Sequence, residues 1–157
     1  MTTIIKYFRR SVGMDSKDSA ILAELLADSR QSTALIARKT GIPRATVHER
    51  IQRFREKGLI RRFTAELDHS LLGRPTTAFV LVGLSPSSES ASRSIAKKVL
   101  SVNGVGEARL VAGEWDLIVK ARAASLEELS FSVVGRIRGI KGVSRTLTLP
   151  VLKGRRG

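Results

Sequence analysis

The sequence predicts an α+β protein with two domains: an N-terminal helix-turn-helix (winged-helix-like) domain and a C-terminal ferredoxin-like domain of order β-α-β-β-α-β. Residues 14–57 contain three successive stretches with apolar residues at helical spacing. Residues 76–152 contain four strand-like runs and two helical stretches. In this second part, VNGVGEARL and IKGVSRTLT each place Gly-Val and a strand after a helix, as two similar halves would.

The first predicted helix begins after Met14. Either Asp15 or Ser16 supplies its N-cap, and Asp18 in the first turn suits the helix dipole. The stretch ADSRQS ends this helix. Its buried side is predicted from apolar residues at helical spacing: Ile21, Leu22, Leu25 and Leu26.

Two shorter helices follow. Ser32 is the expected N-cap of a helix from about Thr33 to Thr40, and Gly41 suits a left-handed turn after it. Pro43 lies near the start of the third helix, where its missing N–H costs nothing. The inward stripe of this helix is Val47, Ile51 and Phe54.

The next segment connects the two domains. GLIRRFTAELD predicts a strand, either a small wing or an exit strand, and HSLLGRP predicts a hinge. We therefore divide the chain into a basic arm over residues 1–13, a helix-turn-helix domain over 14–62, a linker strand and hinge over 63–75, and a ligand-binding and oligomerisation domain over 76–157.

In the C-terminal part the predicted strands are TTAFVLVGL, GVGEARLVA, WDLIVKARA and GVSRTLTLPVL, and the helices are SSESASRSIAKKVLSV and SLEELSFSVVGRIRGI. Only Gly113-Glu114 separates the middle strands, which predicts a tight hairpin. Ser125 and Glu128 predict a capping box. The core stripe of the second helix is predicted to be Leu126, Leu129, Val133 and Ile137.

One face of this sheet is left without helices. Both helices of a β-α-β-β-α-β sheet lie on the same side, and the other face must be covered by something else. On that face Ile118 lies with Asp116 and Lys120, and AFVLV is apolar on both sides. We expect a second copy of the chain to cover it.

Composition narrows the function classes. The net charge of +14 and pI of about 11.3 favour a polyanionic partner. Aromatic residues are 4% of the chain, too few for a base-stacking platform. The absence of cysteine excludes disulfides and thiolate metal sites, and two histidines, His48 and His69, have no metal-ligand spacing. No apolar run is long enough to span a bilayer or serve as a secretory signal, so we expect no membrane partner and a cytoplasmic location.

The third helix combines a basic outer face with the last position of a helix-turn-helix, which predicts binding to double-stranded DNA. Arg44 suits a bidentate contact to guanine, and Glu49 either accepts from cytosine or orients an arginine. Arg50 contacts a phosphate or, alternatively, pairs with Glu49 or Glu56. The base-reading residues are predicted to be Arg44, Ala45, Thr46, His48 and Glu49, and the phosphate contacts Ser32, Thr33, Arg50, Arg53 and Lys57.

The ordered combination of these parts resembles the Lrp/AsnC (feast/famine) family of transcriptional regulators over residues 14–153. The likeness lies in DSKDSAILAELLADSRQSTALIARKTGIPRATVHERIQRFREKGLIRRFTAELD, in VAGEWDLIVKA and in GVSRTLTLPVLK. It implies a sequence-specific DNA-binding regulator with no catalytic residue, cofactor or metal. It also implies a homodimer that assembles further, into an octamer or another multiple of dimers, and an amino acid or a related small molecule as effector.

The resemblance places the effector near the predicted hairpin, at Gly113 and Asp116. Asp116 would receive the ammonium group and the N–H at Gly113 the carboxylate; alternatively, both residues only shape the turn. The chain has Ala112 and Trp115 where the family commonly has Thr and Tyr.

Two other functions are compatible with the architecture. The high charge would suit a non-specific architectural DNA-binding protein, which differs from a regulator in its specificity ratio. Certain sirohaem decarboxylases also resemble this family in fold, but residues 76–157 contain no histidine. Acylphosphatase-type chemistry, which also occurs on ferredoxin-like folds, needs a phosphate-cradling loop, and the sequence has no motif for one. We expect no enzymatic activity.

Overall fold

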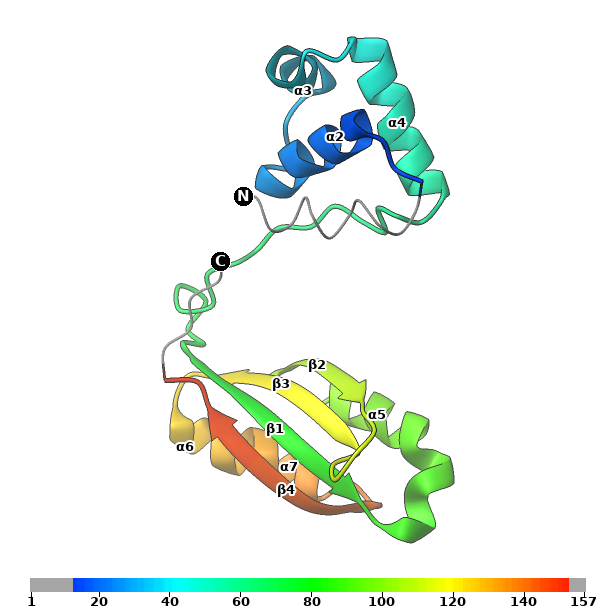
Figure 1. Ribbon diagram of the computed structural model, residues 1–157. Coiled ribbons are helices and arrows are strands. Elements are labelled where there is room, and N and C mark those ends of the chain that lie inside the picture. The colour runs from blue at the N-terminus through cyan, green and yellow to red at the C-terminus, as the bar shows by residue number, and fades with distance from the viewer. Residues whose placement is uncertain (1–12, 153–157) are drawn as a thin grey trace. The chain divides into compact units, whose positions relative to one another are not determined.

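A computed structural model describes residues 13–152 and divides the chain into two compact units, Met1–Glu66 and Leu67–Gly157 (Figure 1). The division falls inside the segment assigned to the linker. Of the arm predicted over residues 1–13, only Gly13 lies within the described residues.

The N-terminal unit is built from three helices, α2 (Ser16–Ala27), α3 (Thr33–Thr40) and α4 (Arg44–Glu56). The N-cap of α2 is Asp15, whose side chain accepts from the N–H of Asp18 at 2.8 Å while Asp18 accepts from the N–H of Asp15. Ser32 caps α3 by accepting from the N–H of Leu35 at 3.2 Å. Gly41 follows α3 with a φ of 70°, which only glycine adopts without strain. These predicted helix ends are confirmed.

A small apolar core joins the three helices, and its buried members are Ile21, Leu22, Leu25, Ile36, Ile42, Val47 and Phe54. Leu26 was expected in this core, but 59% of it is exposed. Successive residues turn by about 100° around a helix, so Leu26 lies well away from the stripe centred on Leu25.

The strand predicted over residues 58–68 is wrong: this stretch forms no strand within residues 13–152. Residues 61–68 are all exposed. A strand requires backbone hydrogen bonds to a neighbouring strand. Within residues 13–152, no strand pairs with residues 61–68. A turn follows at the predicted hinge, where the N–H of Arg74 donates to the carbonyl of His69 at 2.8 Å.

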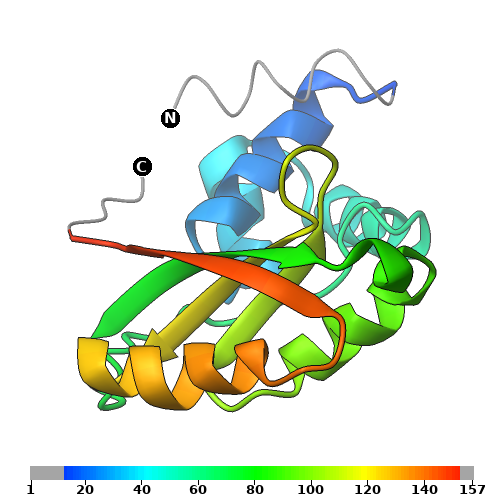
Figure 2. The same ribbon diagram turned by 90° about the horizontal axis from the view of Figure 1, so that it is seen from below.

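The C-terminal unit is an antiparallel sheet of order β2-β3-β1-β4, made of β1 (Thr76–Leu84), β2 (Val105–Leu110), β3 (Leu117–Ala123) and β4 (Val143–Pro150). One helical connection contains the 3₁₀ turn η1 (Pro86–Ala91) and α5 (Ser92–Leu100). The other is α6 (Leu126–Glu128), the π-helical segment η2 (Leu129–Val134) and α7 (Gly135–Arg138). Figure 2 shows the helices on one face of the sheet, which confirms the ferredoxin-like order β-α-β-β-α-β.

The core of this unit lies between the sheet and its helices. Leu126 was expected there but is largely exposed. It is the first helical residue, and helical side chains lean toward the N-terminus, so its side chain points beyond the end of the helix. The buried core includes Ala78, Val80, Val82, Ile95, Val99, Leu117, Val119, Ala121, Leu129, Val133 and Ile137.

The hairpin between β2 and β3 is longer than predicted. Instead of two residues, residues 111–116 lie between the strands, and the N–H of Val111 donates to the carbonyl of Asp116 at 2.9 Å. Gly113 has a φ of 137°. The paired register of the two strands ends at Leu110 and Leu117, earlier than the apolar pattern indicated.

Candidate nucleic-acid interface

Helix α4 carries most of the predicted contact residues. Val47 and Phe54 are buried, whereas Arg44, His48 and Glu49 are exposed. Ala45 is also exposed, and Thr46 is half-buried. The structure therefore brings the predicted base-reading residues together at one end of one helix, and all but Thr46 are exposed.

The N-terminus of α4 lacks a capping hydrogen bond from the described side chains. Its N-cap residue is Pro43, and among residues 13–152 no side chain caps the helix. By contrast, Asp15 and Ser32 cap the other two helices of this unit. Uncapped N–H groups and the positive end of the helix dipole favour a negatively charged partner at this end.

Arg44 also reaches the start of α3. Its Nε donates to Oγ1 of Thr33 at 3.4 Å. Ser32 lies next to Thr33, and its hydroxyl is engaged as the cap of α3. The predicted residues Ser32, Thr33 and Arg44 thus form a connected group between two helix N-termini.

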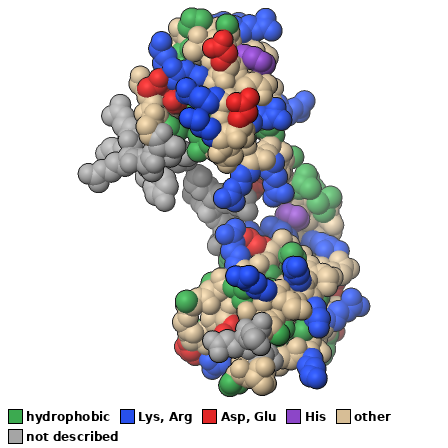
Figure 3. Space-filling model, turned by 90° about the vertical axis from the view of Figure 1, so that its right-hand side faces the viewer, with side chains coloured by type: hydrophobic (Ala, Val, Ile, Leu, Met, Phe, Trp, Pro, Cys, Tyr) green, Lys and Arg blue, Asp and Glu red, His purple; other side chains and the backbone are tan. Residues whose placement is uncertain are grey.

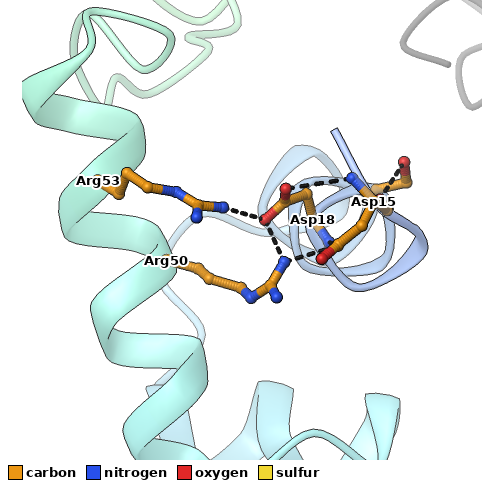
Figure 4. A network of polar contacts seen from close by, with 5 residues as sticks. Asp15, Asp18, Arg50 and Arg53 are labelled. Atoms are coloured by element: carbon orange, nitrogen blue, oxygen red, sulfur yellow. Dashed lines mark hydrogen bonds and ion pairs between the residues drawn. The ribbon is translucent and has the colours of Figure 1, made fainter. Parts of the chain in front are cut away.

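Arg50 and Arg53 lie beside the core stripe and turn toward α2 rather than outward (Figure 4). Arg50 Nη1 lies 2.6 Å from Oδ1 of both Asp15 and Asp18. Arg53 Nη2 lies 2.8 Å from the same Oδ1 of Asp18. One expected role of Arg50 was an ion pair with Glu49 or Glu56. Arg50 instead forms ion pairs with two aspartates at the start of α2. Sequence spacing gave no signal for this, because 32 to 35 residues separate Asp18 from the two arginines.

Two carboxyl groups of the unit have lowered pKa values. The hydrogen bond from Arg50 holds the pKa of Asp15 below its usual range, and the hydrogen bond from Lys39 does the same for Glu24. The same contact with Asp15 raises the pKa of Arg50. Each pair joins α2 to another helix of the unit.

Acid is expected to weaken this unit. A carboxyl group whose pKa is lower in the folded than in the unfolded protein stabilises the fold above its unfolded pKa of about 4, and this contribution disappears as the pH falls through the folded value. Urea unfolding followed by circular dichroism should give a lower free energy of unfolding at pH 3 than at pH 5. The Asp15→Asn variant should lose less between these pH values; an equal loss would contradict the assignment.

Other cations of this unit are also exposed. Arg55 and Lys57 extend from the C-terminal part of α4. Arg38 is exposed in the last turn of α3, and Arg61 and Arg62 are exposed after α4. Of these cations, only Lys57 is among the phosphate contacts predicted from the sequence. The space-filling view shows Lys and Arg side chains distributed over the visible face of each unit (Figure 3).

The predicted effector residues lie in the β2–β3 loop. Asp116 Oδ2 accepts from the N–H of Leu84 at 2.7 Å, and the N–H of Asp116 donates to the carbonyl of Val82 at 3.0 Å. Asp116 therefore anchors the loop to the end of β1. At Gly113 an added Cβ would meet no atom within 4 Å, so its φ angle, rather than crowding, accounts for the glycine.

Trp115 in the same loop is covered by an arginine of β4. The Arg145 guanidinium lies 4.4 Å from the centroid of the Trp115 ring, and Arg145 Nη2 donates to the carbonyl of Glu114 at 3.0 Å. A guanidinium at this distance makes a cation–π contact that helps to hold the loop.

Among residues 13–152, no group of three or more His, Cys, Asp or Glu side chains is placed to hold a metal ion. None of the helices described in this range is long and apolar enough to cross a membrane.

Comparisons with known proteins agree with the division into two units. A family model for a winged helix-turn-helix DNA-binding domain matches residues 14–61, and one for the Lrp/AsnC ligand binding domain matches residues 77–155. An uncharacterised HTH-type transcriptional regulator of Pyrococcus furiosus is 41% identical over 136 residues, which cover 87% of this chain and 91% of that protein.

Two solved structures show the same fold. AsnC of E. coli superimposes with a TM-score of 0.81 at 24% identity, covering 92% of this chain and 95% of that one. A transcriptional regulator of Neisseria meningitidis in complex with L-Met superimposes with a TM-score of 0.84 at 20% identity, covering 92% and 93%.

Proposed function

The chain belongs to the Lrp/AsnC family of DNA-binding transcriptional regulators, and we propose that it reads specific promoter sequences with the N-terminal half of α4. In this proposal Arg44 donates to guanine, His48 and Glu49 meet neighbouring base edges, and Ala45 and Thr46 make the closest apolar approach. Ser32, Thr33 and Lys57 contact phosphates and fix the register of the helix.

The observation that carries the proposal is the exposed, uncapped N-terminal end of α4. It presents Arg44, His48 and Glu49 to solvent, next to N–H groups that lack a capping side chain. In helix-turn-helix proteins this end of the recognition helix contacts base edges in the major groove. The surrounding exposed cations supply the phosphate attraction that such binding needs.

The test is the ratio of specific to random DNA affinity across a salt series. Duplexes would first be enriched by binding from a randomised pool, and the enriched duplex would then be compared with a scrambled duplex of equal composition by fluorescence anisotropy. A regulator is expected to keep a ratio of about 10³ or more as salt rises. Equal affinities would instead support the second candidate, a non-specific architectural DNA-binding protein, which the net charge of +14 favours.

We further propose that the chain forms homodimers through the sheet face that carries no helices. Phe79, Leu147 and Leu149 are exposed on this face although they are large and apolar. Phe79 is paired with Leu149, and Leu81 lies between Leu147 and Ile118 in the strand register, so these side chains are neighbours. A continuous apolar patch of this kind favours a partner with a matching patch, and a second copy supplies one. Assembly of dimers into an octamer or another multiple remains a prediction.

We also propose an amino acid as effector, bound at the β2–β3 loop by Asp116 and the N–H at Gly113. The match of residues 77–155 to a ligand-binding domain and the L-Met complex of the Neisseria meningitidis regulator support this class of ligand. Asp116 would bind the ammonium group through its negatively charged carboxylate, which also accepts from the N–H of Leu84.

The Asp116→Asn variant separates this role from the structural one. Asparagine keeps an oxygen that can accept from the N–H of Leu84 but removes the negative charge. We expect its melting temperature without ligand to stay within a few degrees of the wild-type value, and the thermal shift caused by an amino acid to disappear. If the wild-type protein shows a shift with an amino acid and the variant keeps it, Asp116 does not bind the ammonium group.

A further inference from the structure

We propose that Asp18 is a positioning residue for DNA recognition: from α2 it holds Arg50 and Arg53 of the recognition helix away from DNA phosphates and fixes the orientation of α4. The inference rests on the proposed base-reading role of α4. It assigns a part in DNA specificity to the Asp18 carboxylate, which belongs to α2 and not to the recognition helix.

The geometry concentrates two cations on one buried oxygen. The Asp18 side chain is only 4% exposed, and its Oδ1 lies 2.6 Å from Arg50 Nη1 and 2.8 Å from Arg53 Nη2. Its other oxygen, Oδ2, accepts from the N–H of Asp15 as part of the capping box. Both oxygens of Asp18 are thus engaged, one by the start of α2 and one by α4 (Figure 4).

Burial makes these contacts persistent. If Arg50 or Arg53 turned to a phosphate, it would leave a nearly buried carboxylate with one cation fewer, which is costly because Asp18 has almost no access to water. Arg50 is itself only 17% exposed and is also bound to Asp15. Arg53 is 45% exposed, so it is the arginine that a phosphate would reach first if Asp18 released it.

The position of the contacts explains why they would act on specificity. Arg50 and Arg53 lie one turn apart along α4, on the flank of its buried stripe. Two points of attachment one turn apart restrain rotation of the helix about its axis as well as its displacement. Because Arg44, His48 and Glu49 project from the same helix, such a restraint fixes the direction in which they meet the base edges.

The matching experiment compares Asp18→Asn with Glu24→Gln in the full chain. Both variants remove one negative charge from α2, but Glu24 pairs with Lys39 of α3 and not with α4. The measurements are the affinities for the enriched and the scrambled duplex over a salt series, with circular dichroism and thermal melting as folding checks. A third variant, Arg53→Gln, breaks one of the two attachments without releasing a cation.

For Asp18→Asn we expect affinity for scrambled DNA to rise several-fold, with the salt slope steeper by about 1 to 2 as released arginines reach phosphates. The specificity ratio should fall about tenfold, comparable to the loss of one base contact. Arg53→Gln should also lower the ratio, but without a steeper slope, and it stands in for Asp18→Asn if that variant does not fold. Glu24→Gln should change neither the ratio nor the slope by a similar amount.

The inference is overturned if Asp18→Asn folds and matches Glu24→Gln in ratio and slope, or if Arg53→Gln leaves the ratio unchanged. Failure of the proposed function has a different signature, since the wild-type protein would then show no preference for the enriched duplex. A merely structural role for Asp18 would lower the melting temperature and leave the salt slope unchanged.

Discussion

The Arg44→Ala variant is expected to lose about 1–3 kcal/mol of discrimination at one base pair of the DNA site. The Arg44 side chain is exposed at the first position of α4, and its only described hydrogen bond, to Thr33 Oγ1, is long at 3.4 Å. It is therefore free to turn to the paired acceptors of a guanine. The loss should appear at a single position when each base pair of the enriched duplex is replaced in turn.

Arg55→Ala is the matched control for this prediction. Arg55 is an exposed arginine of the same helix, but it lies in the last turn, far from the N-terminal end. We expect its loss to weaken binding to every duplex alike and to reduce the salt slope by about 1. If Arg44→Ala behaves in this way too, Arg44 contacts a phosphate and the base-reading assignment is wrong.

The largest effect on assembly is expected from Leu147→Asp. Leu147 is 44% exposed on the helix-free face of the sheet, beside Leu81, and in the proposed dimer it is buried. A carboxylate buried there without a partner costs several kcal/mol, enough to convert the dimer to monomers at micromolar concentration. Sedimentation velocity would measure the change.

The same variant should bind DNA far more weakly. Two linked α4 helices on two half-sites bind with an avidity that exceeds the affinity of one by about 10²–10⁴-fold, and monomers forgo this gain. Leu126→Asp is the matched control, because Leu126 is also an exposed leucine but lies at the first position of α6, on the helix layer. A Leu147→Asp protein that stays dimeric would rule out this face as the interface.

Much of the fold follows from short-range signals in the sequence. Asp15, Ser32 and Ser125 cap helices within three residues, through hydrogen bonds to nearby N–H groups, and this chemistry can be read from neighbouring letters. The order of strands and helices in the C-terminal unit likewise follows from the periodicity of apolar residues. The candidate base-reading residues were identified in the same way, because the exposed face of a helix is set by its buried stripe.

Predictions from neighbouring residues failed where the local structure depends on pairing with a second segment of the chain. Residues 58–68 have strand-like composition, but no strand among residues 13–152 pairs with them, and the ladder between β2 and β3 ends at Leu110. The pattern of apolar residues alone cannot show which segments pair, because the hydrogen-bonding partner of a strand lies in another part of the chain.

By itself, the sequence determined the two-domain architecture, the helix ends, the strand order along the chain and the basic, polar face of α4. The tertiary structure alone decided which of the arginines on α4 are held in ion pairs within the protein. Arg50 and Arg53 look like their neighbours in the sequence, yet folding pairs them with aspartates 32 to 35 residues away along the chain. The physical reason is that an ion pair depends on distance in space and on burial, neither of which is a property of neighbouring residues in the chain.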